Sequence, residues 1–244
     1  MTHSPLPLIA ILRGITPAEV RAHVRGLIDA GITQIEIPTN SPDWLGSVQL
    51  ALQEADGHAE VGAGTVLDIA DVDRLADSGA RLMVTPNTDP VVIAHARSRG
   101  LDIAAGFATA SEAFAALAAG AQRLKLFPAA HFGPAYVRAL KAVLPVDVPL
   151  YAVGGIGTDN LAAFLQAGCA GAGLGGELFA ELLRYGAACR VRLREEMQIE
   201  FTIEDGQLSV LDAVKVARSA RAGLKIAVAL AGAWKLNKLI ALYD

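Results

Sequence analysis

The sequence of 244 residues has little of what a disulfide framework, a membrane span or a nucleic-acid interface requires. Two cysteines, Cys169 and Cys189, are too few for such a framework, and they lack metal-ligand spacing. The longest apolar run near the end, 226–234, is too short to cross a bilayer. The 21 basic and 25 acidic residues are spread along the chain without a basic block, which argues against nucleic-acid binding.

The beginning of the chain also lacks the pattern of a secretory signal. An apolar stretch begins at Leu6 without a basic flank and ends at Arg13. Apolar residues make up 53% and charged residues 19%, as in globular proteins, and the length is ordinary for an α/β barrel. We therefore expect a cytoplasmic protein in a reducing compartment, with no membrane and no nucleic acid among its partners.

Short strand-like runs alternate with helix-like runs from Leu8 onward. Strands that alternate with helices pair in parallel through right-handed crossovers. Eight such units favour a closed (β/α)₈ TIM barrel over an open doubly wound sheet, whose glycine fingerprint is missing from the first βα turn. The predicted strands are 8–12, 34–37, 60–63, 81–84, 102–105, 123–127, 149–153 and 170–174, and clear helices are 17–30 and 111–119.

The chain after the predicted barrel has a different pattern. We assign residues 1–185 to the barrel domain and 186–244 to an atypical C-terminal extension. Polar and apolar residues alternate over 198–204, Asp205-Gly206 follows, and the alternation resumes at Leu208. This pattern predicts a β-hairpin with a type I′ turn, followed by a helix from about residue 212.

Lys125 lies within an apolar run that has the composition of a buried strand. An ammonium ion there is costly unless it is paired, deprotonated or used in chemistry. Burial lowers the pKa of a lysine, and a neutral amine is the nucleophile that forms a Schiff base with a carbonyl. We predict that Lys125 has this role. The alternative is a lysine that extends its charged end to water at the strand terminus.

Glu36 lies between Ile35 and Ile37 in a strand that ends at Pro38. Burial raises the pKa of a carboxylate and a nearby ammonium lowers it, so a buried Glu–Lys pair can move protons near neutral pH. The alternative is a structural ion pair inside the barrel. Two glycine pairs, Gly154-Gly155 and Gly175-Gly176, follow the last two strands, where barrels of this kind commonly bind phosphate. The alternative for each pair is a tight turn.

Seven segments, in the same order along the chain, resemble the class I aldolases that cleave 2-keto-3-deoxy-6-phosphogluconate and its galactonate epimer. The resemblance implies a Schiff-base lysine at Lys125, a general acid/base at Glu36 and a contact of Thr65 with the pyruvyl carboxylate. It also implies a turn at Pro86 that shapes the site, and phosphate contacts at the two glycine pairs. The segments are IAILRG (9–14), IEIP (35–38), GAGTVL (62–67), VTPN (84–87), LKLFP (124–128), AVGGI (152–156) and GAGLG (171–175).

The resemblance also suggests which epimer is the substrate. The gluconate-type enzymes carry an arginine four residues after the glutamate, where this chain has Asn40, and an arginine is found instead at Arg13. This looks like the galactonate branch, with Arg13 in substrate recognition. The implied products are pyruvate and D-glyceraldehyde 3-phosphate, and the gluconate epimer and 4-hydroxy-2-oxoglutarate are the alternative substrates. The implied assembly is a homo-oligomer, a trimer by resemblance.

No metal and no other cofactor is expected, because the mechanism implied by the resemblance needs none and the histidines fall on predicted helices or loops. Two other functions compete with the aldolase. One is a phosphosugar isomerase or synthase, because the fold and the phosphate turns serve many functions. The other is a barrel without catalytic activity that only binds a phosphosugar. Neither rival requires a lysine opposite a glutamate.

Overall fold

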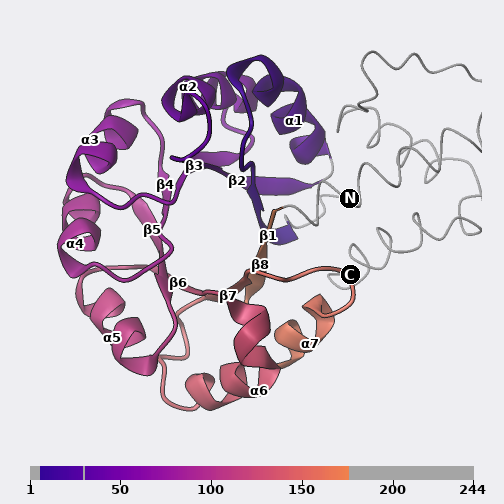
Figure 1. The fold of residues 1–244 in the computed structure, drawn as a ribbon, viewed down its shortest axis with the longest axis vertical. Helices are drawn as coiled ribbons and strands as arrows, with labels where there is room; N and C mark the ends of the chain where they lie inside the picture. The colour runs from indigo at the N-terminus through magenta and orange to yellow at the C-terminus, as the bar shows by residue number, and fades with distance from the viewer. Residues whose placement is uncertain (1–5, 30, 176–244) are drawn as a thin grey trace, which may run out of the picture.

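The computed structural model describes residues 6–29 and 31–175 (Figure 1). The predicted boundary between the domain 1–185 and the extension 186–244 lies outside the described residues, as do the predicted hairpin and helix of that extension. Gly176 and Cys189 also lie outside them.

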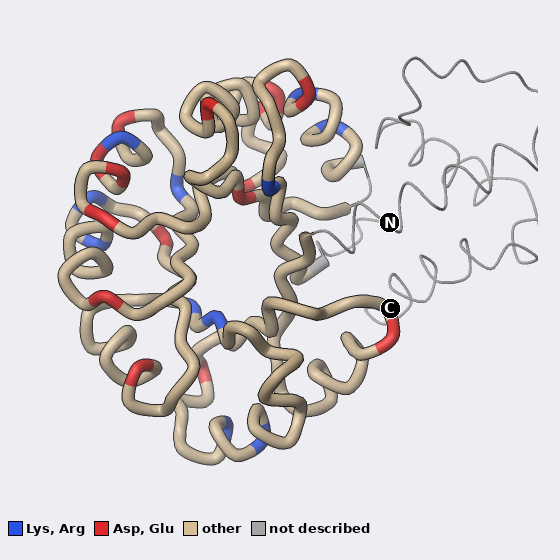
Figure 2. The backbone as a smooth tube through the Cα atoms, in the orientation of Figure 1, with Lys and Arg blue, Asp and Glu red and all other residues tan. Residues whose placement is uncertain are grey.

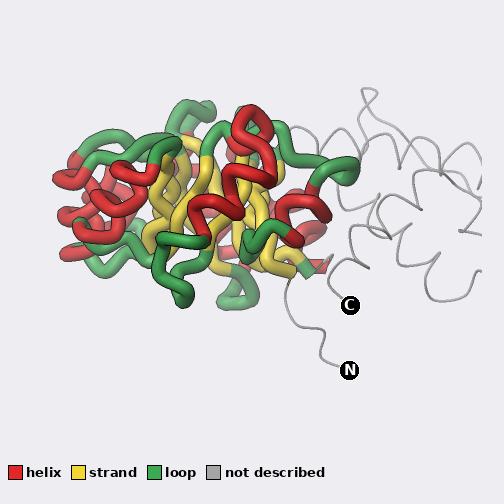
Figure 3. Tube along the Cα trace, turned by 90° about the horizontal axis from the view of Figure 1, so that it is seen from below, coloured by secondary structure: helices red, strands yellow, loops and turns green. Residues whose placement is uncertain are grey.

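The described residues form a closed barrel of eight parallel strands, which confirms the predicted (β/α)₈ architecture. Each strand pairs with its neighbours in chain order, and β1 pairs with β8 to close the barrel. The helices surround the strands (Figures 1 and 3). The strands are β1 (Leu6–Ile11), β2 (Ile32–Pro38), β3 (Glu60–Gly64), β4 (Leu82–Val84), β5 (Asp102–Phe107), β6 (Arg123–Leu126), β7 (Leu150–Val153) and β8 (Gly171–Leu174). The helices are α1 (Pro17–Asp29), α2 (Trp44–Ala55), α3 (Ile69–Asp77), α4 (Pro90–Ser98), α5 (Ala110–Ala118), α6 (Ala129–Lys141) and α7 (Leu161–Gln166).

The predicted strand and helix boundaries fall within two residues of the observed ones. Phe127 was predicted inside the sixth strand but follows it, because β6 ends at Leu126. Gly31, Gly79, Gly120 and Gly168 lie just past helix ends and all have positive φ, the conformation that closes the last turn of a helix.

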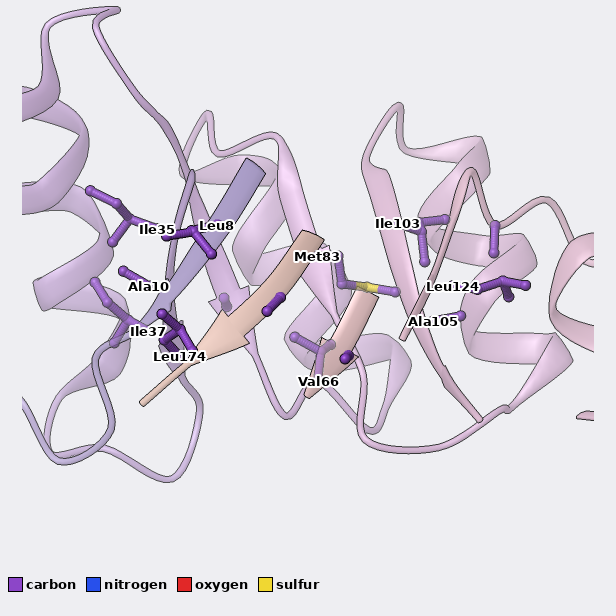
Figure 4. Close-up of a cluster of buried hydrophobic side chains, with 14 of the residues drawn as sticks. Leu8, Ala10, Ile35, Ile37, Val66, Met83, Ile103, Ala105, Leu124 and Leu174 are labelled. Atoms are coloured by element: carbon purple, nitrogen blue, oxygen red, sulfur yellow. The ribbon is translucent and has the colours of Figure 1, made fainter. Parts of the chain in front are cut away.

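Side chains alternate between two separate apolar clusters, because successive residues of a strand point to opposite faces. The outward cluster packs between strands and helices and includes Leu8, Ile35, Ile37 and Leu124 (Figure 4). A smaller cluster, the inward cluster, fills part of the barrel interior. It consists of Ile9, Leu82, Val84, Ala104, Tyr151 and Val153. Since their strand neighbours point outward, Glu36 and Lys125 belong to the inward set.

A group of charged side chains closes the barrel at the end where the strands begin. We call Arg123, Gln34, Glu60 and Asp102 the Arg123 cluster. Arg123 Nη2 donates to Glu60 Oε2 at 2.9 Å and also to Asp102, and its Nη1 donates to Gln34 Oε1 at 3.2 Å. The Arg123 side chain is only 13% exposed. Within the cluster, two carboxylates therefore neutralise the charge of one largely buried guanidinium group.

Arg123→Met should lower the free energy of unfolding by about 2–4 kcal/mol. Removing one partner of a buried ion pair leaves the other charges uncompensated, which costs about 3–5 kcal/mol when burial is complete. The lower range applies because Glu60 and Asp102 keep some exposure. Urea unfolding monitored by circular dichroism measures the difference. The control is Arg25→Met, which removes an exposed arginine from its pair with Glu54 while Arg21 remains paired with Glu54, and which should cost about 1 kcal/mol or less. Equal losses from the two variants would contradict the structural role of the cluster.

Candidate active site

Glu36 and Lys125 face each other across the barrel. Glu36 is on β2, between Ile11 of β1 and Gly62 of β3, and Lys125 is on β6, between Gly106 of β5 and Tyr151 of β7. In a closed ring of eight strands, β2 and β6 are opposite. Both side chains are near the C-terminal ends of their strands, the end of such barrels that carries chemistry. Figure 2 shows that most charged residues lie on the outer helices and few at the inner rim.

Glu36 carries a buried carboxyl group inside the barrel. Its exposed fraction is 2%, and its Oε2 atom has no hydrogen-bond partner among the described residues. Burial raises the pKa of Glu36 to about 7, although the charges of Lys125 and Arg13 oppose the shift. A carboxyl group with this pKa can accept or donate a proton near neutral pH.

Gly64 provides the space that the Glu36 carboxylate occupies. A Cβ atom built on Gly64 would come within 1.8 Å of Glu36 Oε2, a distance that no pair of non-bonded atoms tolerates. Any side chain at the end of β3 would therefore displace the carboxylate. Gly64 lies in one of the segments that carry the family resemblance, but nothing in its local sequence pattern indicates this role.

Lys125 is 7% exposed, so nearly all of this residue is buried. Burial lowers the pKa of Lys125, with Glu36 acting against the shift and Arg13 adding to it. In the described part of the chain, no ion pair joins Lys125 to Glu36. The Lys125 Nζ atom lies 5.2 Å from the centre of the Phe127 ring. This environment favours a neutral, nucleophilic amine.

Arg13 and Asn40, the two positions that the sequence analysis linked to epimer choice, contact each other. Arg13 Nη1 donates to Asn40 Oδ1 at 2.8 Å. The next residue on each segment is also joined, since the Gly14 N–H donates to Ser41 Oγ at 3.0 Å. The exposed Arg13 guanidinium is thus held at the rim, close enough for its charge to affect Glu36 and Lys125.

Thr65 and Pro86 lie in the connections that follow β3 and β4. Thr65 has φ 59°, and its carbonyl accepts a 2.7 Å hydrogen bond from Thr39 Oγ1. Pro86 lies against β5, because a Cβ on Gly106 would be 2.3 Å from the Pro86 carbonyl carbon. Gly106 is the register partner of Lys125, so the Pro86 turn lies beside the lysine strand.

The glycines predicted to bind phosphate follow β7 and β8. Gly154 and Gly155 have φ values of 91° and 71°, a conformation that side chains with a Cβ rarely adopt. A Cβ on Gly154 would also lie 3.0 Å from the Phe127 ring, so this turn packs close to the lysine. Asn160 Nδ2 donates to the Gly155 carbonyl at 2.8 Å and fixes the turn. Gly175 follows β8 directly.

A hollow of about 550 Å³ lies at the opposite end of the barrel, where the strands begin. Its walls include Glu60 and Asp102 of the Arg123 cluster, together with Arg81, Arg97 and Gln122. None of the predicted site residues that the structure describes is among its walls. Buried, perturbed groups mark the other end, which we take as the candidate site. No three His, Cys, Asp or Glu side chains within 6–29 and 31–175 are grouped as metal ligands.

Comparison with known proteins gives a consistent set of similarities. The family model described as "KDPG and KHG aldolase" matches residues 3–186. A 2-dehydro-3-deoxy-6-phosphogalactonate aldolase of Escherichia coli K12 is 55% identical over 174 residues, which cover 71% of this chain and 85% of that protein. A probable enzyme of the same name from Rhizobium meliloti 1021 is 49% identical over 173 residues, covering 71% and 82%. A solved structure described as "Native KDPGal structure" is 45% identical, with a TM-score of 0.70 and coverage of 88% and 96%.

Proposed function

Because the chain belongs to the KDPG and KHG aldolase family, we propose that it is a class I aldolase that cleaves 2-dehydro-3-deoxy-6-phosphogalactonate. The products are pyruvate and D-glyceraldehyde 3-phosphate. The observation that carries the proposal is the pair of buried groups, Lys125 and Glu36, that face each other without forming an ion pair. The substrate choice is supported by the printed names of the two relatives at 55% and 49% identity.

The reaction uses the two buried groups in sequence. The neutral amine of Lys125 attacks the C2 ketone, and loss of water gives an iminium ion. Glu36, in its ionised form, removes the proton of the C4 hydroxyl, and the C3–C4 bond breaks as its electrons move toward the iminium. The aldehyde product leaves, and an enamine of pyruvate remains on the lysine. Glu36 returns the proton to C3, and hydrolysis releases pyruvate and the free amine.

The remaining predicted residues bind the two ends of the substrate in this proposal. Thr65 contacts the carboxylate of the pyruvyl part, and the Pro86 turn shapes the space beside the lysine strand. The backbone N–H groups of Gly154, Gly155 and Gly175 contact the phosphate. Gly176, outside the described residues, has the same proposed role.

The reaction as proposed requires no metal and no other cofactor. A homotrimer and a cytoplasmic location complete the proposal, supported by the family to which the chain belongs. Within the part of the chain that the structure describes, no helix combines the length and the apolar character needed to span a membrane.

The purified protein should cleave the galactonate substrate with a kcat/KM about 10- to 100-fold higher than that for its gluconate epimer. The epimers share the pyruvyl end and the phosphate, so only groups that face the C4 hydroxyl can discriminate. One hydrogen bond between the C4 hydroxyl and a charged group, lost in the wrong epimer, accounts for this range. Parallel assays of pyruvate release from the two phosphates measure the ratio.

Arg13→Met provides the matched comparison, since it removes the arginine that Asn40 holds. The ratio of the two kcat/KM values should fall toward one in this variant. A wild-type ratio near one, or one that favours gluconate, would overturn the assignment to the galactonate substrate. Release of pyruvate from neither phosphate would overturn the aldolase proposal and favour an isomerase, a synthase or a binding barrel.

A further inference from the structure

Thr65 has a backbone conformation that its residue type disfavours. Its φ of 59° lies in the left-handed region, where a β-branched side chain is an outlier. The other described non-glycine residues with positive φ are Asp43 and Asp56, which cap the two ends of α2 and belong to a type that tolerates this region. Strain of this kind persists only where the surrounding structure imposes it.

Thr39 contacts the peptide groups on both sides of Thr65. Its N–H donates to the carbonyl of Gly64 at 2.8 Å, and its Oγ1 donates to the carbonyl of Thr65 at 2.7 Å. The Gly64 carbonyl belongs to the peptide plane before Thr65, and the Thr65 carbonyl belongs to the plane after it. The relative rotation of these two planes is the conformation of Thr65. One residue therefore fixes both planes.

Thr39 is itself held by its surroundings. The preceding residue, Pro38, is paired with Gly64 in the sheet. The two following residues reach the opposite neighbour, where Asn40 contacts Arg13 and Ser41 contacts Gly14. The segment after β2 is thus joined to the ends of both β1 and β3. Because the segment after β2 is fixed at both of these neighbouring strands, its side chains can hold Thr65 in a strained backbone conformation.

We propose that Thr39 is a positioning residue that holds Thr65 in its left-handed conformation, so that Thr65 meets the carboxylate of the keto acid. This inference rests on the proposed aldolase function, in which Thr65 contacts the pyruvyl end. Thr39 acts through Thr65 and does not touch the substrate. Its effect therefore extends to pyruvate itself and to both epimers alike, because all three present the same carboxylate.

The test compares Thr39→Val, which keeps the shape and loses the hydroxyl, with Thr39→Ser, which keeps the hydroxyl. The readout is the pyruvate concentration that gives half-maximal borohydride labelling of the protein. Thr39→Val should raise it by roughly 5- to 20-fold, the effect of one lost hydrogen bond. Thr39→Ser should stay within about 2-fold of wild type, because the bond remains. Labelling at saturating pyruvate should be complete in both variants. Thr39→Ala replaces Thr39→Val if valine prevents folding, with the same expected rise.

A second comparison tests whether Thr39 acts through Thr65. Glycine adopts the left-handed region without strain, so Thr65→Gly no longer needs an imposed conformation. In that background, Thr39→Val should change the half-saturating pyruvate concentration by less than about 2-fold. The inference would be overturned if Thr39→Val left the half-saturating pyruvate concentration of the otherwise wild-type protein unchanged. It would also be overturned if Thr39→Val raised that concentration by the same factor with threonine and with glycine at position 65. Absence of any labelling in the wild type would instead refute the proposed function.

Discussion

Lys125→Arg should abolish both the borohydride-dependent labelling by pyruvate and the cleavage of the phosphorylated substrate. The guanidinium keeps the positive charge, but its pKa is too high for it to become a neutral nucleophile. The native lysine differs because burial lowers the pKa of its amine. Loss of a covalent nucleophile should reduce turnover by roughly 10⁴-fold or more. Mass spectrometry of the trapped protein should locate the added pyruvyl mass on Lys125.

Two further variants separate chemistry from folding in this experiment. Lys125→Met removes the charge as well as the nucleophile, and it should be as inactive as the arginine variant. Lys141→Arg changes a lysine of α6 outside the candidate site and should label and turn over as wild type does. Labelling that survives in Lys125→Arg would assign the Schiff base to another amine.

Glu36→Gln should allow Schiff-base formation with pyruvate while retro-aldol turnover falls by roughly 10²- to 10⁴-fold, the usual contribution of a positioned acid/base. Glutamine keeps the shape of the side chain beside Gly64 and cannot accept the C4 hydroxyl proton. In the wild type, the pKa of Glu36 is about 7 because the group is buried. The ionised base is therefore lost as pH falls, and kcat/KM should decline below about pH 7 in the wild type.

The pH profile identifies the group that moves the proton. The midpoint of this decline should move in Glu36→Gln, because protonation of the Lys125 amine is then the step that limits the rate as pH falls. A variant that retains the same decline, or that turns over at the wild-type rate, would show that another group is the base.

Thermal unfolding provides the control for folding. Burial raises the Glu36 pKa from 4.5 to about 7, so its ionised form destabilises the folded state as pH rises through 7. The Glu36→Gln variant should consequently have an unfolding temperature at pH 8 that is at least as high as that of the wild type.

The sequence was sufficient to predict the barrel and the opposition of its two buried groups. Alternating runs predict strands and helices, and the order of strands in a closed parallel barrel places the second opposite the sixth. Glu36 and Lys125 were visible because each interrupts an apolar run, so the expected cost of burial pointed to a function.

Other features depend on neighbours that are distant in sequence and could not be predicted this way. Thr39 follows a strand, as many threonines do, and its importance appears only when the Thr65 conformation is known. That conformation opposes the residue's own preference, so no propensity argument predicts it. Gly64 is required by the position of the Glu36 carboxylate, and Arg123 is paired across several strands. Local sequence patterns contain no signal for such contacts.

The inward cluster has an electrical consequence. On β5, the inward positions lead from Asp102 in the Arg123 cluster through Ala104 to Gly106 beside Lys125. The charges that shift the pKa of Glu36 are those of Lys125 and Arg13, whereas those that act on Arg123 come from Glu60 and Asp102. The apolar layer thus keeps the two charged groups apart by distance, because a layer of low dielectric constant does not itself weaken the interaction between charges. Each end of the barrel therefore has its own set of interacting charges.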